Sequence, residues 1–389
     1  MRAFLDPDFH PGLLGGGQLG RMLLAAGFRF QQRFSVLDPD PRAPCFDLCP
    51  PGQFLQGALT DHDRVCSFAE NLDLLTVEIE NVSTSALRAL RDRGVVVRPA
   101  PEVIELVQDK LVQKRFLRER GFPTADFVPV DRANDLVGLR DRLPGVLKLR
   151  RAGYDGRGVR VLKSEADFDQ AFEQPALLEH LVPFEREIAV LVSRNASGEI
   201  ACYDAVEMEF HPEQNLVELL FAPARLSDTL QKRARELACD LANTLGIEGL
   251  LAVEMFVHEE RLLINEIAPR PHNSGHHTIE ACVTSQFEQH LRAILNLPPG
   301  DPRLVQPAVM INLLGESGSA ASFEAKTAQV RKLLARPGVH LHLYGKRESR
   351  PFRKMGHITV TDANLEQALK TAREIRRQIG NGISATGPG

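Results

Sequence analysis

The sequence predicts an α/β protein with several domains, the first of them built on a doubly wound parallel sheet. Near the N-terminus, short apolar stretches alternate with amphipathic ones, which is the pattern of parallel strands joined by helices. The chain has 389 residues, more than one hydrophobic core usually holds, so two or three domains are expected. Hydrophobic residues make up 43% and charged residues 25% of the chain, as is typical of globular proteins.

The N-terminal domain is predicted over residues 1–105, with strands at 12–17, 34–37, 74–79 and 95–97 and helices at 18–27 and 84–92. Gly15, Gly17 and Gly20 form a G-x-G-x-x-G turn between the first strand and the first helix. Such glycines let backbone N–H groups approach a phosphate at a helix N-terminus. Because Asp38 ends the second strand, where dinucleotide-binding folds carry an acidic residue, a nicotinamide-dependent oxidoreductase stays open as an alternative.

A second domain is predicted over residues 106–298, entered through an amphipathic helix at 102–120. Its expected strands and helix follow at 146–149, 176–179, 186–192, 200–207, 225–246 (the helix), and around Glu254 and Glu266. The turn at 153–158 holds three glycines around three functional side chains, so its N–H groups can close over phosphates, although glycine would also favour a plain hairpin.

The proline-rich segment 297–302 is expected to link this unit to a small C-terminal domain at 299–380. Strands are predicted there at 308–313, 339–343 and 356–361, with a helix at 365–379. The glycine-containing tail at 381–389 is expected to be disordered.

Bulk properties argue against several classes of protein. A net charge of −4 gives no basic surface for nucleic acid, no apolar run reaches the length of a membrane span, and no secretory signal is evident. Six cysteines in so long a chain do not make a disulfide scaffold, and Cys45 and Cys49 have no second pair to complete a metal site. We therefore expect a cytoplasmic protein with reduced thiols that binds neither nucleic acid nor membrane.

Two acidic residues lie in apolar surroundings late in the second domain. Glu254 stands in LLAVEMFV and Glu266 in LLINEIA, so both are expected on adjacent strands. A carboxylate on a buried strand is costly unless a cation compensates it. Magnesium carrying nucleotide phosphates is the predicted partner, and a salt-bridged structural pair is the alternative.

Four other charged residues are candidates for the same site. Lys148 lies inside an apolar strand and needs an anionic partner, which could be a phosphate or a structural carboxylate. Lys110 lies on a helix, where a lysine is more often a surface charge. Glu179 and Glu187 stand at strand ends, where they could bond adenine or ribose or could be exposed edge charges.

Polar segments late in the chain are candidates for binding a substrate. Arg270 could grip a carboxylate or phosphate bidentately. The run 272–277 contains three histidines without thiolates, so contact with a polar substrate is favoured over a zinc site. The basic stretch 346–354 could clamp an anionic substrate or could be a solvated surface.

These features, in this order, resemble the ATP-grasp superfamily. Within it, the chain is similar to the family that carboxylates aminoimidazole ribonucleotide in purine biosynthesis. The segments that carry this likeness are LGGGQLGRM at 14–22, EIENV at 78–82, GYDGRG at 153–158, INEIAPRPHNSGH at 264–276, HLYGK at 342–346 and RPFRKMGH at 350–357.

The resemblance implies a pre-ATP-grasp domain, an ATP-grasp domain with a lid at about 124–190, and a small C-terminal α+β domain. It implies ATP and Mg²⁺ or Mn²⁺ as cofactors, with the metal held by Glu254 and Glu266. The implied ATP-binding residues are Lys110, Lys148, Gly153, Tyr154, Asp155, Gly156, Arg157, Gly158, Glu179, His180, Leu181, Val182, Glu187, His211, Asn265 and Glu266.

The resemblance also implies aminoimidazole ribonucleotide and bicarbonate as substrates and a homodimer as the assembly. The implied substrate-binding residues are Gly17, Gln18, Leu19, Glu78, Tyr154, Arg157, Arg270, His272, Asn273, Ser274, Lys346 and Arg353. Asp155, Arg270 and His272 are the implied catalytic residues, with Arg270 holding carboxyphosphate and either Asp155 or His272 removing the proton. Ala268 stands where many ATP-grasp enzymes carry a metal-binding Asn, so two carboxylates must suffice.

Other functions remain open alternatives at this stage. Another ATP-grasp ligase, carboxylating or formylating a small phosphorylated substrate, would use the same nucleotide residues. A non-catalytic nucleotide sensor is a more distant alternative, because the two carboxylates expected to hold the metal are intact.

Overall fold

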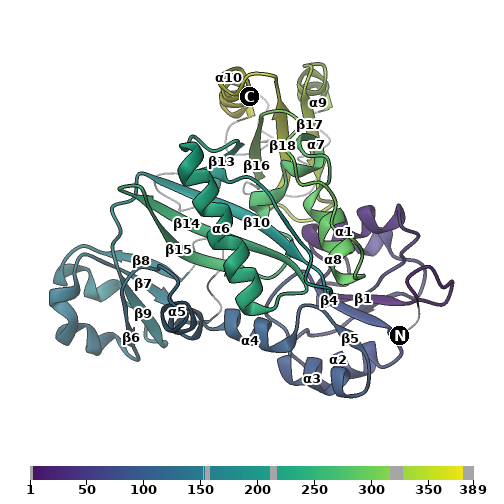
Figure 1. The fold of residues 1–389 in the computed structure, drawn as a ribbon, viewed down its shortest axis with the longest axis horizontal. Helices are drawn as coiled ribbons and strands as arrows, with labels where there is room; N and C mark the ends of the chain where they lie inside the picture. Colours follow the sequence, from purple (N-terminus) through teal and green to yellow (C-terminus); the bar gives the residue numbers. More distant parts are fainter. Residues whose placement is uncertain (1–2, 152, 154–157, 211–216, 316–326, 380–389) are drawn as a thin grey trace, which may run out of the picture.

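This computed structural model describes residues 3–151, 153, 158–210, 217–315 and 327–379. Their strands form three sheets. Figure 1 shows the N-terminal sheet and the lid at opposite sides of the central sheet, with the C-terminal strands at its far end. The fold class predicted from the sequence, α/β with a parallel N-terminal sheet, is confirmed.

The N-terminal sheet is parallel, with the strand order β3-β2-β1-β4-β5. Helix α1 packs on one face together with α8 of the central unit, and α2 and α3 pack on the other face. Strand β3 escaped prediction because its three residues carry too short a pattern, and helix α2 was not predicted either. The elements are β1 (Pro11–Leu14), α1 (Gln18–Phe28), β2 (Ser35–Asp38), β3 (Phe54–Gln56), α2 (His62–Ala69), β4 (Leu74–Val77), α3 (Thr84–Asp92) and β5 (Val96–Val97).

The lid is a small antiparallel sheet with the order β6-β9-β7-β8. Its inner apolar face is closed by two 3₁₀ segments, η2 and η3. Its elements are β6 (Phe127–Val130), η2 (Ala133–Arg142), β7 (Gly145–Leu149), β8 (Val159–Leu162), η3 (Glu165–Gln170) and β9 (Ala176–His180).

The central sheet is antiparallel and runs in the order β15-β14-β10-β12-β13-β16-β18-β17, with β11 beside β10. Strands from the C-terminal region therefore continue the sheet that carries Glu254 and Glu266, through the pairing of β13 with β16. The strands are β10 (Arg186–Arg194), β11 (Ile200–Cys202), β12 (Val206–Phe210), β13 (Val217–Ala222), β14 (Gly249–His258), β15 (Arg261–Ala268), β16 (Ala308–Leu314), β17 (Val339–Leu343) and β18 (Lys354–Thr361).

Long helices cover this sheet and connect the units. Helix α6 packs on β10 and β14 in the largest apolar cluster, and α10 packs on β16 and β18. The remaining helices are short, and several lie where one unit meets another (Figure 1). The helical elements of the central and C-terminal units, with η1 of the N-terminal unit, are α4 (Pro101–Gln108), α5 (Lys110–Glu119), α6 (Asp228–Leu245), α7 (Thr278–Ala281), α8 (Gln286–Ile294), α9 (Thr327–Leu334), α10 (Leu365–Ile379), η1 (Phe46–Leu48) and η4 (Asn273–Gly275).

The single helix predicted at 102–120 is wrong, because α4 and α5 are separated at Asp109. This residue has the extended backbone of an N-cap, and its carboxylate accepts from Leu111 N–H and Val112 N–H. It also pairs with Arg150 at 2.6 Å. The apolar periodicity continues across the break, so the sequence pattern alone did not reveal it.

The strand predicted at 200–207 also divides, into β11 and β12, while β13, which pairs with β12, was missed. Within the described residues, no helix is both long enough and apolar enough to cross a membrane. The predicted disordered tail lies outside the described residues, and the domain boundaries proposed from the sequence stay a prediction.

Candidate active site

Two carboxylates face each other across the hairpin of β14 and β15. Glu254 is directly opposite Glu266 in the register of these antiparallel strands, so both side chains leave the same face of the sheet. The Glu254 side chain is 20% exposed and that of Glu266 is 46% exposed. The prediction that two acidic residues lie on adjacent strands is therefore confirmed.

The charges beside the two carboxylates are unequal. Lys110, the first residue of α5, forms an ion pair with Glu266. Burial opposes ionisation of Glu266, but the Lys110 ammonium outweighs it and lowers the pKa of this carboxyl below its ordinary value. For Glu254, burial and then repulsion from Glu266 raise the pKa to about 7, and His272 Nε2 lies 3.7 Å from its Oε1.

The donor set at this pair fits a hard divalent cation. Its oxygen atoms are the ligands that Mg²⁺ prefers, and a cation there would oppose the burial and the repulsion from Glu266 that raise the pKa of Glu254. In the described ranges, no group of three or more His, Cys, Asp or Glu side chains is placed to hold a metal ion. The protein would thus supply two carboxylates, and the remaining ligands would come from phosphates and water.

Lys148 joins the lid to the strand that carries Glu266. From β7, its ammonium donates to Glu179 Oε2 at 2.9 Å and to Asn265 Oδ1 at 2.8 Å. The Asn265 amide in turn donates to Glu187 Oε1 at 3.3 Å. Burial, followed by repulsion from Glu254, raises the pKa of Glu187 to about 8. The structural carboxylate that the sequence left open as a partner of Lys148 is thus present, namely Glu179.

Lys114 belongs to this network although the sequence analysis did not select it. It lies on the inner face of α5, is 2% exposed, and places its ammonium 3.3 Å from Glu179 Oε1. Burial lowers the pKa of Lys114 to about 8, although the negative charge of Glu179 acts to raise it. Its spacing of four residues from Lys110 was the available signal, since both lysines then share one helix face.

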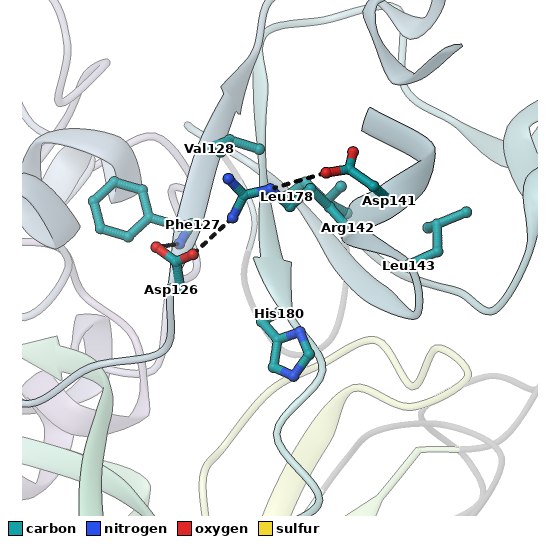
Figure 2. Close-up of a pocket in the computed structure, with 8 residues that line it drawn as sticks. All are labelled: Asp126, Phe127, Val128, Asp141, Arg142, Leu143, Leu178 and His180. Carbon is teal, nitrogen blue, oxygen red and sulfur yellow. Dashed lines mark hydrogen bonds and ion pairs between the residues drawn. The ribbon is translucent and has the colours of Figure 1, made fainter. Parts of the chain in front are cut away.

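The residues expected around adenine lie at the end of β9 and just after it. Glu179 is 2% exposed and points to the lysines, whereas His180 is exposed and points to the other face of the lid sheet. Figure 2 shows His180 at a pocket it shares with Asp126 and Arg142, whose ion pair measures 2.8 Å. Leu181 is partly buried and Val182 buried, with the Leu181 N–H bonded to Pro144 O at 3.3 Å.

Part of the predicted lid lies within the described residues. Gly158 has a φ of 77° and its carbonyl accepts from Leu149 N–H at 2.8 Å, which closes the β7–β8 hairpin. Gly153 is partly buried. The predicted residues Tyr154, Asp155, Gly156, Arg157 and His211 lie outside the described residues.

Carboxylates occupy the backbone N–H groups of the glycine loop. Gly17 N–H and Gly20 N–H donate to the two oxygens of Glu78, each at 2.8 Å, and Gly16 N–H donates to Asp38 Oδ2 at 2.6 Å. A Cβ on Gly17 would lie 2.5 Å from Glu78 Oε1, so only glycine allows this approach. Burial raises the pKa of Glu78, although the hydrogen bonds from Gly17 and Gly20 act to lower it.

This loop therefore binds the Glu78 carboxylate and begins α1 with Gln18 and Leu19. Gln18 is partly exposed, and Leu19 packs into the core shared by α1 and α8. The predicted substrate residue Glu78 is thus brought to the loop, whereas the Leu19 side chain is part of the core.

The loop after β15 is anchored from several directions. Arg270 pairs with Glu80 of the N-terminal unit at 2.7 Å. His272 Nδ1 lies 2.9 Å from Ser274 Oγ, and Ser274 is 1% exposed. The amide of Asn273 exchanges two hydrogen bonds with that of Asn312 on β16, at 2.9 and 3.0 Å.

Gln286 and Asn312 position this loop, and sequence reasoning missed both. The wholly buried Gln286 side chain accepts from His272 N–H at 2.9 Å and donates to His272 O at 2.8 Å. A lone amide on a helix or strand gives no signal of such a role in a single sequence.

Lys346 and Arg353 lie in the segment between β17 and β18, and both are partly exposed. Lys346 Nζ donates to Lys354 O at 2.7 Å, and Arg353 Nη1 donates to Glu348 O at 3.0 Å. β18 pairs with β16, the strand of Asn312, so this basic segment belongs to the same side of the fold as the loop after β15.

Three family models match successive parts of the chain. The ribonucleotide synthetase preATP-grasp domain matches residues 10–108, the ATP-grasp domain 115–287, and the phosphoribosylaminoimidazole carboxylase C-terminal domain 308–371. Together with the acidic pair and its lysines, these matches define an ATP-grasp enzyme, an ATP-dependent ligase. The N5-carboxyaminoimidazole ribonucleotide synthase of Synechococcus elongatus is 40% identical over 387 residues, which cover 96% of this chain and 95% of that protein. The chain belongs to the N5-carboxyaminoimidazole ribonucleotide synthase family.

Solved structures agree with this assignment. The N5-carboxyaminoimidazole ribonucleotide synthetase of Thermotoga maritima has a TM-score of 0.83 and 39% identity, covering 95% of this chain and 98% of that one. The N5-carboxyaminoimidazole synthase of Aspergillus clavatus, in complex with ADP and 5-aminoimidazole ribonucleotide, has a TM-score of 0.87 and 32% identity, covering 95% and 99%. The family predicted from the sequence motifs is confirmed, and the nicotinamide alternative is wrong.

Proposed function

We propose that this enzyme uses ATP and bicarbonate to carboxylate the amine of 5-aminoimidazole ribonucleotide, giving N5-carboxyaminoimidazole ribonucleotide, ADP and phosphate. Family membership supports this reaction, as does the Aspergillus clavatus relative crystallised with ADP and 5-aminoimidazole ribonucleotide. In the reaction, a bicarbonate oxygen takes the γ-phosphoryl group of ATP. The amine nitrogen then attacks the carboxyl carbon, and phosphate leaves.

The observation that carries the nucleotide half is the opposed pair of Glu254 and Glu266 with lysines beside it. These two carboxylates would hold Mg²⁺ or Mn²⁺, which when bound neutralises charge on the transferred phosphoryl group. Lys110 and Lys148 would donate to phosphate oxygens, since both ammonium groups lie next to residues of β15. Glu179 and Glu187 would border adenine and ribose, together with Leu181 and Val182.

The loop after β15 is proposed to bind the reacting groups. Arg270 would hold the carboxylated phosphate through its planar guanidinium, because two parallel N–H donors match an oxyanion. His272 or Asp155 would accept the proton that the amine loses. The remaining contacts to the ribonucleotide would come from Glu78, Asn273, Ser274, Lys346 and Arg353. Exclusion of water by the lid would protect the carboxylated phosphate from hydrolysis.

We further propose that the domains divide at residues 1–105, 106–298 and 299–380. The shared central sheet supports a rigid connection between the last two, because hydrogen bonds between β13 and β16 run across the boundary. A homodimer and a cytoplasmic location are proposed from the family resemblance.

Release of ADP under defined substrates tests the reaction. Production of ADP should require both bicarbonate and 5-aminoimidazole ribonucleotide for full rate, with one carboxylated product formed per ADP. If ADP is produced faster with formate than with bicarbonate, or faster with another amine acceptor than with 5-aminoimidazole ribonucleotide, the enzyme is a different ATP-grasp ligase. Absence of ADP release under every combination would refute the proposal.

A further inference from the structure

Lys114 makes contacts that reach both sides of the nucleotide site. Its ammonium lies 3.3 Å from Glu179 Oε1 on the lid strand β9. The same ammonium donates to Ile264 O on β15 at 3.3 Å and to Thr124 Oγ1 at 2.7 Å. The side chain is 2% exposed, so none of these contacts is exchanged readily with water.

Lys114 and Lys148 together close a ring between the lid and β15. Both ammonium groups contact Glu179, Lys114 at Oε1 and Lys148 at Oε2. On β15 the two lysines bond consecutive residues, since Lys114 donates to the Ile264 carbonyl and Lys148 to the Asn265 side chain. Glu179 is therefore tied to β15 by two separate cations.

The chain segment that enters the lid is fixed at the same place. Ile264 N–H donates to Pro123 O at 2.8 Å, and Thr124 Oγ1 donates to Ile264 O at 2.7 Å. Thr124 comes just before β6, the first lid strand, and Ile264 comes two residues before Glu266. Lys114 thus lies where the segment that leads into the lid contacts β15, the strand that carries Glu266.

We propose that Lys114 is a positioning residue for the nucleotide, which sets the separation between Glu179 on the lid and Glu266 on β15. The inference rests on the proposed function, because these two residues are there assigned to the adenine and phosphate ends of ATP. Without Lys114, the 2% exposed Glu179 would keep Lys148 as its only cation in this ring. Lys148 would then be held toward Glu179 and away from phosphate.

Titration of ADP with Mg²⁺ by calorimetry tests the proposal on the whole chain. Lys114→Met should weaken ADP binding by at least about tenfold, because one partner of a buried ion pair is removed. Arg115→Met is the matched control, since it removes a cation from the exposed face of the same helix, and its Kd should change by less than about twofold. In steady state, the KM for ATP should rise in Lys114→Met while the KM for 5-aminoimidazole ribonucleotide stays within about twofold.

A double substitution separates positioning from general destabilisation. If Lys114 acts through Glu179, then Lys114→Met combined with Glu179→Gln should bind ADP within about twofold of Glu179→Gln alone. Fully additive losses, or a folded Lys114→Met protein that binds ADP like the unaltered protein, would overturn the inference.

Thr124→Val provides a variant that keeps the shape of the site if Lys114→Met does not fold. It removes one acceptor of the Lys114 ammonium and should weaken ADP binding by about threefold or more. Unchanged affinity in Thr124→Val would overturn the inference. Failure of the unaltered protein to bind ADP would instead refute the proposed function.

Discussion

Glu254 and Glu266 stand directly opposite each other on β14 and β15, and only Glu266 has a lysine as an ion-pair partner in the described residues. The two carboxyls consequently differ, because the pKa of Glu254 is raised to about 7 by burial and by its neighbour, while that of Glu266 is lowered. Burial and mutual repulsion therefore keep Glu254 protonated over a higher range of pH than Glu266.

Replacing Glu266 tests the acidic pair. Glu266→Gln should lower turnover by at least about a hundredfold, because an amide keeps the shape but supplies no charge to a divalent cation. The measurement is ADP release at saturating ATP, with thermal unfolding to show that the fold survives. Glu260→Gln, an exposed change on the turn of the same hairpin, is the control and should keep the full rate. Near-normal turnover in Glu266→Gln would refute the metal assignment.

The stability of the nucleotide-free protein should fall as pH rises from 6.5 to 8. Glu187 has a pKa of about 8 in the folded protein against 4.5 as its ordinary value, so in this window the folded state still binds a proton that the unfolded state has lost. Raising the pH removes that proton and lowers the free energy of unfolding, by at most about 1.4 kcal/mol per pH unit for one group.

Urea unfolding at several pH values measures this effect. Glu187→Gln should flatten the slope between pH 6.5 and 8, whereas Glu260→Gln should leave it unchanged. The buried histidines His276, His277 and His290, whose pKa values are lowered by burial, act below pH 6.5 with the opposite sign. An equal slope in Glu187→Gln and the unaltered protein would contradict the prediction.

The pair of Arg270 and Glu80 gives a third test. Arg270→Lys should lower turnover by about a hundredfold, because lysine cannot present two parallel donors to an oxyanion. Its effect on stability should stay within about 1 kcal/mol, since a lysine can still pair with Glu80. Glu80→Gln should reduce turnover by less than about tenfold. Equal losses in the two variants would mean that Arg270 matters only through its contact with Glu80.

The glycine loop gives a fourth test, of packing rather than charge. Gly17→Ala should destabilise the protein by about 1–3 kcal/mol, because the added Cβ would lie 2.5 Å from Glu78 Oε1. Gly138→Ala is the control, since a Cβ there meets nothing within 4 Å and the backbone is not left-handed. Thermal unfolding compares the two, and equal stability would mean that Glu78 moves aside without cost.

Much of the fold could be predicted from local patterns. Helices at 84–92 and 365–379 and the strand at 339–343 were predicted with the bounds that the structure has. Each carries a clear apolar period over its own length, so it needs no information from distant residues. The opposed glutamates were also predictable, because a charged residue inside an apolar strand is conspicuous.

Gln286 and Asn312 could not be selected in this way, and only its four-residue spacing from Lys110 marked Lys114. Each acts through contacts with residues far along the chain, such as Ile264, His272 and Asn273. For Gln286 and Asn312, the helix and the strand present the side chain without any local pattern, so the sequence alone gives no signal of their role. The break at Asp109 was missed for a different reason, since the apolar periodicity continues across it.

The sequence by itself determined the class of fold, the family and the acidic couple, because these depend on periodicity and on motifs that are contiguous in the chain. The tertiary structure alone decided that strands from the C-terminal region extend the sheet of that couple. It also decided which cation neutralises which carboxylate, since the free energy of a buried charge depends on neighbours that the fold brings together from far apart.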